Sequence, residues 1–445
     1  MRFLFLILDF IVFFLTSAIV LFSRVSSSWS LLFFLDHCKI LVPLFILNVI
    51  LLLIFSFYDI KRYTIRHRND FTELSMLFII SFVVSSASIY FGAYLFNIPT
   101  PKTILFLILL IFYVYVFLSR QIYNSLHLSQ AKIISLGNSR TMSRLKTTLA
   151  SSQEYKIISS YNDISEIDEN LDIKDIDFVL VSNNLLEHDK NTALLIFYKF
   201  VSKGVTCLTD LEFFENLFSR LPKETLRNVI WLIRDISNRQ ENSIYSATKR
   251  LFDFLFAVCL IPVFLPLGIL IYFLILIVDK QKPIFFQERV GFNGKTIQIC
   301  KFRTLINGTE TPTKVGKFLR KFRLDEIPQL INILDGNISI VGPRPLQKED
   351  NDLLNKYIPA HVLRDIIKPG LTGWSQLNYK APCNYSAMKT PEFENDAQKN
   401  EYFKDAFVRL AYDVWYAKNA SFMLDIEIMF KTAKRAFIKD KKLSD

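Results

Sequence analysis

Near-continuous apolar runs dominate the first 120 residues of the chain. Four of them are about as long as the ~20 residues that a helix needs to cross a hydrocarbon core of ~30 Å. They cover roughly residues 3–22, 40–59, 74–96 and 103–119. A cleaved signal peptide is a poor interpretation of the first run, because three more runs follow and no small-residue cleavage site is evident. The pattern therefore predicts four transmembrane helices in residues 1–120.

The charges between these runs set the expected orientation. Four basic residues lie between the second and third runs, namely Lys61, Arg62, Arg66 and Arg68. By the positive-inside rule this loop is cytoplasmic, so the N-terminus and everything after Arg120 should also lie on the cytoplasmic side. Asp9 falls inside the first run and is formally a functional candidate. Because it is only about two turns from the start of the chain, we expect it to reach the membrane interface.

Residues 121–240 show the alternating pattern of a small α/β module. The apolar stretch AKIISL at 131–136 predicts a strand that ends at Gly137, and a helix follows through Ala150. Three further apolar stretches, KIIS, DFVLVS and VTCLTD, alternate with segments that can be helical. Strands that alternate with helices predict a parallel, Rossmann-like sheet.

Gly137 stands where a phosphate-binding turn of such a module would lie. The local sequence is GNSRTM rather than GxGxxG, so the glycines that let a backbone approach a diphosphate are missing. A nucleotide site and a structural or regulatory module are both open, and the sequence favours the second. Residues 221–248 then predict a helical connector.

A fifth apolar run, residues 251–278, contains Pro262 and Pro266 near its centre. A straight helix of this length would reach ~42 Å at 1.5 Å per residue, although tilt could absorb the excess over the hydrocarbon core. One crossing would place residues 280–445 outside the cell, away from cytoplasmic nucleotides. Proline breaks a helix, so the alternative is a re-entrant helix–break–helix that enters and leaves by the same leaflet. Hydropathy alone favours a kinked fifth span, whereas the motifs below favour the re-entrant form.

Composition narrows the possible partners. Hydrophobic residues make up 51% of the chain, 42 residues are Phe, and the mean hydropathy of +0.27 is high for a soluble protein. The net charge of +11 would suit nucleic acid, anionic lipid or phosphorylated substrates. The apolar runs favour the last two, and we expect no nucleic acid partner. The five cysteines are scattered without metal-ligand spacing, which indicates a reduced compartment.

Short basic blocks rich in glycine and proline follow from about residue 280 onward. They are PIFFQERVGFNGK with Gln287 and Arg289, CKFRT with Lys301 and Arg303, FLRKFRLDEIPQLINIL with Arg320, GNISIVGPRP with Arg344, and KPGLTGWSQ. One basic block alone is more often a solvated face than a site. Several of them around a single adjacent Asp-Glu pair indicate a site that handles phosphates.

Asp325 and Glu326 form that pair. Pro328 is tolerated only in the first turn of a helix, so we expect a helix to start at about 325–326. Asp325 would then lie at the positive end of the helix dipole. One interpretation is an N-cap, which contributes about 1 kcal/mol. The other is a carboxylate beside phosphates and a divalent metal, the combination that phosphoryl transfer needs. The residues alone leave both open.

KRLFDF at 249–254, the proline-containing run and these blocks together resemble the bacterial sugar transferase family, the monotopic polyprenyl-phosphate phosphoglycosyl transferases. The resemblance covers residues 249–445. The preceding helices and degenerate α/β module are similar to the layout of the large members, the undecaprenyl-phosphate glucose or galactose phosphotransferases of capsule, exopolysaccharide and O-antigen assembly. The resemblance implies a mostly helical catalytic domain over residues 241–445, facing the cytoplasm at the bacterial inner membrane.

The resemblance also implies a ping-pong reaction between a UDP-sugar and undecaprenyl phosphate. Asp325 would attack the β-phosphate, release UMP and hold the sugar as an aspartyl phosphodiester, which the lipid phosphate then displaces. Glu326 completes the family's dyad, and Mg²⁺ would be held at Asp325. The positions implied for phosphate or nucleotide binding are Gln287, Arg289, Lys301, Arg303, Arg320 and Arg344. Those implied for the entrance of the re-entrant helix, near the lipid phosphate, are Lys249, Arg250, Asp253 and Pro262.

Two departures from the family pattern affect these expectations. The segment between Thr304 and Val315 is short for a large member, and its only acid is Glu310. A metal or nucleotide contact from further acids in that segment would therefore be missing or come from elsewhere. Residue 305 is Leu where Met is usual, a volume-conserving change. The insert 378–411 matches no family motif and is a candidate for shaping the sugar pocket.

Two other function classes remain as alternatives. A catalytically idle scaffold or regulator of polysaccharide assembly has no reason to keep Lys301, Arg320 and Arg344 together with an intact Asp-Glu pair. A transporter fits poorly with four spans followed by a large polar C-terminal part. The large-member layout favours glucose or galactose over an N-acetylated hexose, and suggests a homodimer.

Overall fold

The computed structural model describes residues 2–24, 31–54, 78, 81–82, 85–86, 102–126, 130–152, 155–167, 176–188, 195–196, 198–227, 232, 243–307, 309, 311–379 and 396–437. The chain divides into two compact units, Met1–Leu217 and Phe218–Asp445. The first contains the N-terminal apolar helices and a four-stranded sheet, and the second contains the blocks that carry the candidate site.

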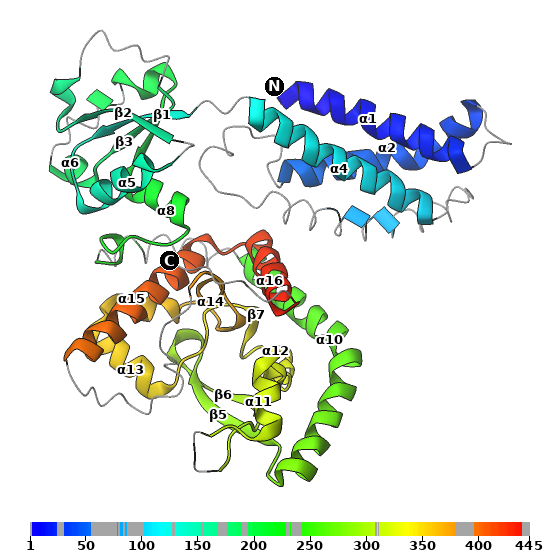
Figure 1. The fold of residues 1–445 in the computed structure, drawn as a ribbon, viewed down its shortest axis with the longest axis vertical. Helices are drawn as coiled ribbons and strands as arrows, with labels where there is room; N and C mark the ends of the chain where they lie inside the picture. The colour runs from blue at the N-terminus through cyan, green and yellow to red at the C-terminus, as the bar shows by residue number, and fades with distance from the viewer. Residues whose placement is uncertain are drawn as a thin grey trace. The chain divides into compact units, whose positions relative to one another are not determined.

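Three apolar helices lie side by side at the start of the N-terminal unit (Figure 1): α1 (Arg2–Arg24), α2 (Leu31–Ile54) and α4 (Lys102–Leu126). Phe3–Ser23 and Phe34–Leu53 are long and apolar enough to cross a membrane, and Phe106–Arg120 is a shorter apolar helix. The predicted helix at 74–96 lies outside the described residues, apart from the helical residues 78, 81–82 and 85–86. A membrane-associated N-terminus is therefore supported, and the helix at 74–96 stays a prediction.

A buried ion pair joins α1 to α4. Both terminal nitrogens of the Arg120 guanidinium donate to the Asp9 carboxylate, at 2.9 and 2.8 Å. The guanidinium also lies over the Phe5 ring, 4.3 Å from its centroid, and Phe13 meets Phe112 edge-on. Residues that ascend along α1 thus meet residues that descend along α4, so the two helices are antiparallel. Asp9 is compensated inside the bundle rather than exposed at an interface.

The α/β module has the predicted parallel sheet. Its strands are β1 (Ala131–Leu136), β2 (Tyr155–Tyr161), β3 (Phe178–Val181) and β4 (Thr206–Thr209), in the order β2-β1-β3-β4. Its helices are α5 (Arg140–Ala150), α6 (Asn183–His188) and α8 (Asp210–Phe218), with 3₁₀ turns at Ile164–Glu166 and Val201–Lys203. The four apolar stretches identified in the sequence are these strands, and their order confirms the Rossmann-like expectation.

The carboxylate of Asp210 lies at the carboxyl ends of the strands, where a phosphate would lie in a nucleotide-binding module. Gly137 makes the turn after β1 with a φ of 76°, and an added Cβ there would lie 2.9 Å from the Cβ of Ser182. The buried carboxylate of Asp210 accepts hydrogen bonds from the Ser139 hydroxyl and, at 3.0 Å, from the Asn183 N–H. In a dinucleotide-binding fold the diphosphate takes donors at this edge. Because Asp210 already accepts hydrogen bonds from donors at this place, a structural role for the module is supported.

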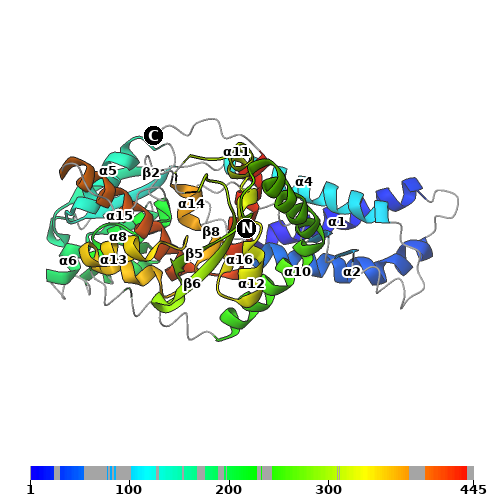
Figure 2. The ribbon, with the colours of Figure 1, turned by 90° about the horizontal axis from the view of Figure 1, so that it is seen from below.

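The C-terminal unit is mostly helical, with two small sheets (Figures 1 and 2). Its helices are α10 (Ser243–Leu274), α11 (Lys314–Lys321), α12 (Gln329–Asp335), α13 (Lys348–Tyr357), α14 (Trp374–Asn378), α15 (Asp396–Asn419) and α16 (Phe422–Phe437). An antiparallel hairpin joins β5 (Ile284–Val290) to β6 (Thr296–Phe302), and β7 (Ser339–Val341) pairs in parallel with β8 (Gly370–Thr372). Short turns are π-helical at Ile275–Asp279 and 3₁₀ at Thr225–Arg227, Phe292–Gly294, Leu324–Glu326 and Pro359–Arg364.

The larger hydrophobic cluster of this unit includes residues that precede α10. Trp374 stacks on Trp415 with ring centroids 5.2 Å apart, and the Trp374 indole donates to the Ser219 carbonyl at 2.8 Å. Leu221 and Leu226 are buried in the same cluster. The C-terminal unit therefore begins upstream of α10, because residues 218–227 complete its core.

Helix α10 is continuous where the sequence predicts a break. Residues 243–274 are helical through both Pro262 and Pro266, and Figure 1 shows the helix as a curve along one side of the unit. Each proline removes one backbone donor and clashes with the preceding turn. Because the two are four residues apart they lie on the same face, so their effects add to a bend in one direction. The predicted interruption is wrong at the level of secondary structure.

Most of α10 is apolar and uncovered. In the most apolar stretch of the candidate membrane segment Tyr245–Asp279, only 11% of the residues are buried. Val263, Leu270 and Ile277 are 65%, 66% and 70% exposed. Such a long unburied apolar surface fits a lipid environment far better than water, which agrees with the predicted membrane insertion of the run.

The ion pair between α1 and α4 gives a test of the N-terminal bundle. Asp9→Asn removes the counter-ion of the buried Arg120 charge, and we expect a loss of about 3–5 kcal/mol in bundle stability. Asp9→Leu combined with Arg120→Met removes both charges and should recover most of that loss. Thermal unfolding of the detergent-purified protein measures both.

Asp36→Asn is the matched control, because the ion pair of Asp36 with Lys39 is largely exposed. Exposed pairs contribute about 0–1 kcal/mol, so this variant should melt like the wild type. Equal melting of Asp9→Asn and Asp36→Asn would contradict a stabilising role for the buried pair.

Candidate active site

The β5–β6 hairpin presents three of the predicted site residues on one face. Side chains two apart on a strand share a face, so Gln287 and Arg289 point the same way along β5. The register places Lys301 opposite Phe285, the preceding residue on that face. Arg289 donates to the Gln287 side-chain oxygen at 2.7 Å. The hairpin therefore brings two cations and one amide to a common surface.

The side chain of Asn332 fixes this hairpin to α12. It accepts a hydrogen bond from the Cys300 N–H at 3.0 Å and donates to the Gln298 carbonyl at 2.7 Å. The primary amide thereby pairs with the outer edge of β6 as another strand would. Figure 2 shows the hairpin beside α12. The apolar block QLINIL thus carries a polar residue that aligns the cationic face with the segment preceding α12.

Asp325 and Glu326 lie in that segment, in a 3₁₀ turn rather than at the start of an α-helix. Leu324–Glu326 is the turn, and it follows Arg323 in a left-handed conformation with a φ of 55°. Helix α12 begins only at Gln329, with Pro328 immediately before it. The N-cap interpretation of Asp325 is therefore wrong, because three residues separate the carboxylate from the first α-helical position.

The turn also lies against the apolar helix α10. Leu324 and Ile327 pack on the apolar cluster that contains Ile271 and Ile275 of α10 and its extension. An added Cβ at Gly268 would make an ordinary van der Waals contact with the Cγ2 atom of Ile327, at 3.7 Å, so the helix packs against the turn here. The carboxylate pair is thereby placed beside the apolar helix α10.

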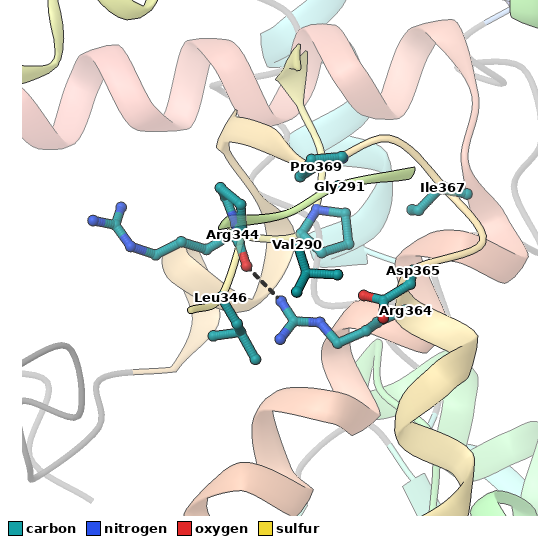
Figure 3. A pocket seen from close by; sticks show the side chains of 10 residues that line it. Val290, Gly291, Arg344, Leu346, Arg364, Asp365, Ile367 and Pro369 are labelled. Carbon is teal, nitrogen blue, oxygen red and sulfur yellow. Dashed lines mark hydrogen bonds between the residues drawn. The ribbon is translucent and has the colours of Figure 1, made fainter. Parts of the chain in front are cut away.

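Arg344 reaches the carboxylate pair from the loop after β7. Its Nη2 lies 3.2 Å from Glu326 Oε1, and the Glu326 side chain is 11% exposed while that of Arg344 is 40% exposed. Figure 3 shows the Arg344 guanidinium pointing away from a small pocket that is lined in part by Val290, Leu346 and Arg364. The Arg344 backbone carbonyl points the other way, toward Arg364.

The electrostatics of the site couple these groups. Burial and the neighbouring Glu326 raise the pKa of Asp325, while Lys301 opposes that rise. Burial and the charge of Arg344 lower the pKa of Lys301 to about 8. Burial, again with Arg344, lowers the pKa of Arg289 to about 10. Two carboxylates and three cations thus share a partly dehydrated space, as at sites that bind anionic ligands.

The other two predicted arginines make local contacts on the described residues. The Arg320 Nε donates to the Thr304 hydroxyl at 2.8 Å, and Arg320 lies close enough to Asp325 to favour its ionised form. The Arg303 Nε donates to the Lys282 carbonyl at 3.0 Å, and its guanidinium lies 5.3 Å from the centroid of the Phe285 ring. Arg320 therefore belongs to the carboxylate site, whereas Arg303 supports the base of the hairpin.

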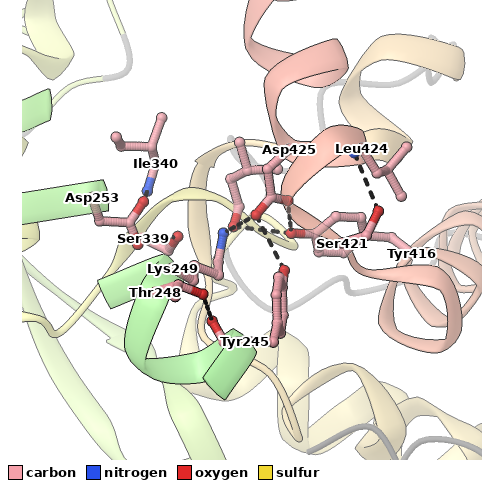
Figure 4. A network of polar contacts seen from close by, with 11 residues as sticks. Tyr245, Thr248, Lys249, Asp253, Ser339, Ile340, Tyr416, Ser421, Leu424 and Asp425 are labelled. Carbon is pink, nitrogen blue, oxygen red and sulfur yellow. Dashed lines mark hydrogen bonds and ion pairs between the residues drawn. The ribbon is translucent and has the colours of Figure 1, made fainter. Parts of the chain in front are cut away.

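The predicted residues at the start of α10 are bound inside the protein. Lys249 forms an ion pair with Asp425 of α16 at 2.6 Å, and Tyr245 and Tyr416 donate to the same carboxylate (Figure 4). Burial raises the pKa of Asp425, and Lys249 opposes that rise.

Arg250 and Asp253 anchor the same helix at two further places. Arg250 donates to the carbonyls of Ile333 and Leu334 at the C-terminal end of α12, where cations are favoured. Asp253 accepts from the Ser339 hydroxyl of β7 at 2.7 Å. Pro262 lies in the middle of α10, where its side chain is exposed. Lys249, Arg250 and Asp253 therefore attach α10 to the rest of the unit.

The acids present fit a magnesium ion only together with a substrate. No group of three or more His, Cys, Asp or Glu side chains poised for a metal occurs within the part of the chain that the structure describes. Mg²⁺ commonly takes one or two carboxylates and completes its shell with substrate phosphates and water. Asp325 and Glu326 provide such carboxylates. Glu310, the only acid of the short segment, lies outside the described residues.

Sequence reasoning missed several polar residues that support the site. Arg364 and Asp413 form a buried ion pair next to the loop that carries Arg344, and Asn332 and Asp425 act as described above. Asn332 and Asp413 lie within the apolar blocks QLINIL and YDVWYA. A polar residue inside an apolar block signals a buried partner, and that signal was available.

Comparisons with known proteins agree on the C-terminal unit. Residues 244–439 match the bacterial sugar transferase family. The uncharacterized sugar transferase EpsL of Bacillus subtilis is 33% identical over 205 residues, which are 43% of this chain and 88% of that protein.

Longer relatives match over the same share of this chain. A UDP-N-acetylgalactosamine-undecaprenyl-phosphate N-acetylgalactosaminephosphotransferase of Aeromonas hydrophila is 35% identical over 203 residues, 43% of this chain and 44% of the relative. A UDP-glucose:undecaprenyl-phosphate glucose-1-phosphate transferase of Escherichia coli is 32% identical over 202 residues, 43% of this chain and 40% of the relative. The match thus spans less than half of the two longer relatives.

The lowered pKa of Lys301 gives a direct test of the site's electrostatics. Because an amine reacts only when deprotonated, Lys301 should reach half-maximal acetylation near pH 8, well below the pKa of ~10.4 of a lysine in solution. Competitive acetylation across a pH series, read by mass spectrometry of the peptide that contains Lys301, measures this value.

Two variants provide opposite controls. Arg344→Gln removes a repelling cation and should raise the pKa of Lys301, whereas Glu326→Gln removes an attracting carboxylate and should lower it. Shifts in the same direction in both variants would contradict the arrangement.

Proposed function

The chain belongs to the bacterial sugar transferase family, and on that premise we propose that it transfers a hexose-1-phosphate from a UDP-sugar to undecaprenyl phosphate. The products would be UMP and undecaprenyl-diphosphate-hexose. Two of its relatives are named for reactions of this kind with GalNAc and with glucose. The reaction class is common to them and the sugars differ, so the proposal for this chain is a hexose-1-phosphate without a choice of hexose.

The observation that carries the proposal is the position of the carboxylate pair beside several cations. Asp325 and Glu326 lie beside Lys301 and Arg344, on the unit that the family match covers. A nucleotide diphosphate brings negative charge that needs fixed cations, and a carboxylate beside it can act as nucleophile. The preorganised cations supply the first requirement and the dyad supplies the second.

In the first half-reaction, we infer, a carboxylate oxygen of Asp325 bonds to the β-phosphorus of the UDP-sugar. The bond from that phosphorus to the bridging oxygen breaks, and UMP leaves with the oxygen and its electron pair. Lys301, Arg289 and Arg344 neutralise charge on the phosphate oxygens. Mg²⁺ held at Asp325 with phosphate oxygens would supply further charge neutralisation.

In the second half-reaction a phosphate oxygen of the lipid bonds to the same phosphorus, and the Asp325 carboxylate leaves. The acceptor must reach the dyad from the membrane. Contact of the dyad segment with α10, through Ile327 and Gly268, supports that direction of approach. Glu326, paired with Arg344, is placed to orient that guanidinium or to handle a proton.

The setting of this reaction is proposed from the same observations. A cytoplasmic active site gives access to nucleotide sugars, so α10 is proposed to re-enter the inner membrane with both ends on the cytoplasmic side. The proline-containing bend supports that form. One relative, the exopolysaccharide production protein ExoY of Sinorhizobium fredii, supports a first membrane step in exopolysaccharide, capsule or O-antigen synthesis. A homodimer and a supporting role for the N-terminal unit complete the proposal.

Replacement of the proposed nucleophile is the decisive test of chemistry. Asp325→Asn keeps the shape of the side chain but cannot form the phosphodiester, so UMP release should fall on the order of 10⁴-fold or more. The folded state raises the pKa of Asp325, which means that its ionised form costs stability at neutral pH. The variant should therefore melt at or above the wild-type temperature.

Mass spectrometry can detect the intermediate directly. Enzyme treated with UDP-sugar and Mg²⁺ but without lipid acceptor should carry a phosphosugar on the peptide that contains Asp325, and Asp325→Asn should not. Glu326→Gln is the matched control, because it keeps the attacking group. Turnover of Asp325→Asn near the wild-type rate would point to direct attack by the lipid phosphate.

The proposed topology has its own test. Single cysteines at Thr248 and Lys282, on either side of the apolar run, should both resist an impermeant thiol reagent applied to the periplasmic side of intact cells. Pro262→Leu with Pro266→Leu restores the two missing backbone donors and favours a straight helix. Position 282 should then become accessible and activity should be lost. Labelling of position 282 from the periplasm in the chain with both prolines would show that α10 crosses the membrane.

A further inference from the structure

Hydrogen bonds from neighbouring segments to the backbone carbonyls of the loop that carries Arg344 hold this loop in place. The Gly370 N–H donates to the Pro343 carbonyl at 2.9 Å, and the Val290 N–H donates to the Leu346 carbonyl at 2.8 Å. Between them, the Arg364 guanidinium donates to the Arg344 carbonyl at 2.6 Å. Two of these three hydrogen bonds are donated by backbone N–H groups, which do not depend on the side chain at that position. The third, which we call the clamp, is donated by the side chain of Arg364.

The prolines on either side make this clamp consequential. Pro343 and Pro345 have no N–H and a fixed φ, so the loop has few hydrogen bonds of its own. A residue before proline is confined to extended conformations, which leaves Arg344 a limited range of ψ. A hydrogen bond to its carbonyl selects one direction within that range. The opposite end of the same residue, its guanidinium, is thereby aimed at Glu326.

Arg364 is itself fixed by a buried counter-ion. Its Nη2 lies 3.2 Å from Asp413 Oδ2, and the two side chains are 8% and 3% exposed. Arg364 ends the 3₁₀ turn Pro359–Arg364, and Asp413 lies in α15. Figure 3 shows the Arg364 guanidinium directed at the Arg344 carbonyl, on the side of the loop away from the Arg344 guanidinium.

We propose that Arg364, held by Asp413, is a positioning residue of the reaction: it sets the conformation of Arg344 and through it the orientation of the guanidinium against Glu326. The inference rests on the proposed function. Asp413 is joined in this way to the carboxylate dyad by an unbroken series of polar contacts through Arg364, Arg344 and Glu326.

The test removes the clamp without leaving a buried charge. Arg364→Met alone would strand the Asp413 carboxylate, so the variant to measure is Arg364→Met with Asp413→Asn, because removal of both charges is far less costly than removal of one. Misplacement of a catalytic group by about 1 Å can cost on the order of a hundredfold. We therefore expect kcat for UMP release to fall about that much, with the KM for the UDP-sugar changed far less.

A double-mutant comparison separates positioning from general destabilisation. Arg344→Met combined with the pair variant should be no slower than Arg344→Met alone, because Arg364 acts only through Arg344. Thr432→Val, which removes a hydrogen bond between α16 and β8, is the control for a loss of stability without loss of the clamp, and its kcat should match the wild type. Unchanged kcat in the pair variant, or losses that multiply with those of Arg344→Met, would overturn the proposal.

A readout that needs no turnover accompanies the kinetics. Arginine modification by phenylglyoxal should be faster at Arg344 in the pair variant than in the wild type, with Arg303 as an internal reference in the same digest. Equal modification of Arg344 would also overturn the proposal. Absence of UMP release from the wild-type enzyme would instead reject the proposed function, and the modification rates would still decide the role of Arg364.

Discussion

Asp325 and Glu326 hold two carboxylates next to each other where burial removes much of the water that would screen them. Such a pair is unfavourable unless cations are fixed nearby. The cations come from separate segments: Lys301 and Arg289 from the hairpin, and Arg344 from the loop after β7. Burial, together with the repulsion between the cations, lowers the pKa of Lys301 and of Arg289. Each set of charges is tolerable only beside the other, so the hairpin, the 3₁₀ turn and the proline-flanked loop have to be assembled as one.

Polar contacts also hold the apolar helix α10 in a fixed position beside the site. Helix α10 buries little of its surface, so packing alone gives it few fixed points. Near its start, Lys249, Arg250 and Asp253 bind α16, α12 and β7 respectively. Further along, Ile271 and Ile275 pack in one apolar cluster with Ile327, two residues from Asp325. The position of the dyad along the helix is therefore set by directional polar contacts at one end and by apolar packing at the other.

Periodicity and local rules predicted the regular parts of the chain, and long-range contacts decided the rest. The four strands of the α/β module were predicted because apolar runs bounded by turns have few alternatives. The start of the helix near Pro328 was predicted three to four residues too early, because a proline can also follow a 3₁₀ turn. The bend of α10 was predicted as a break, since the rule for one proline says nothing about two on one face. Arg364 could not be assigned a role because its partners are distant in the sequence, whereas Asp413 could be recognised as a buried polar residue but not paired with Arg364.

The pairing of Asp9 with Arg120 has a consequence for biosynthesis. The partners are 111 positions apart, on the first and last described helices of the bundle. A ribosome delivers α1 long before it delivers α4, so on the proposed membrane insertion the first helix would meet the bilayer with an uncompensated acid. An acid at the centre of a membrane helix costs about 2.5–3.5 kcal/mol during insertion, and Asp9, in the third turn of α1, would carry part of that cost. Until α4 arrives, the nascent chain would have to keep that side chain hydrated or sheltered by the insertion machinery. On this proposal, pairing with Arg120 is the step that makes the first helix compatible with lipid.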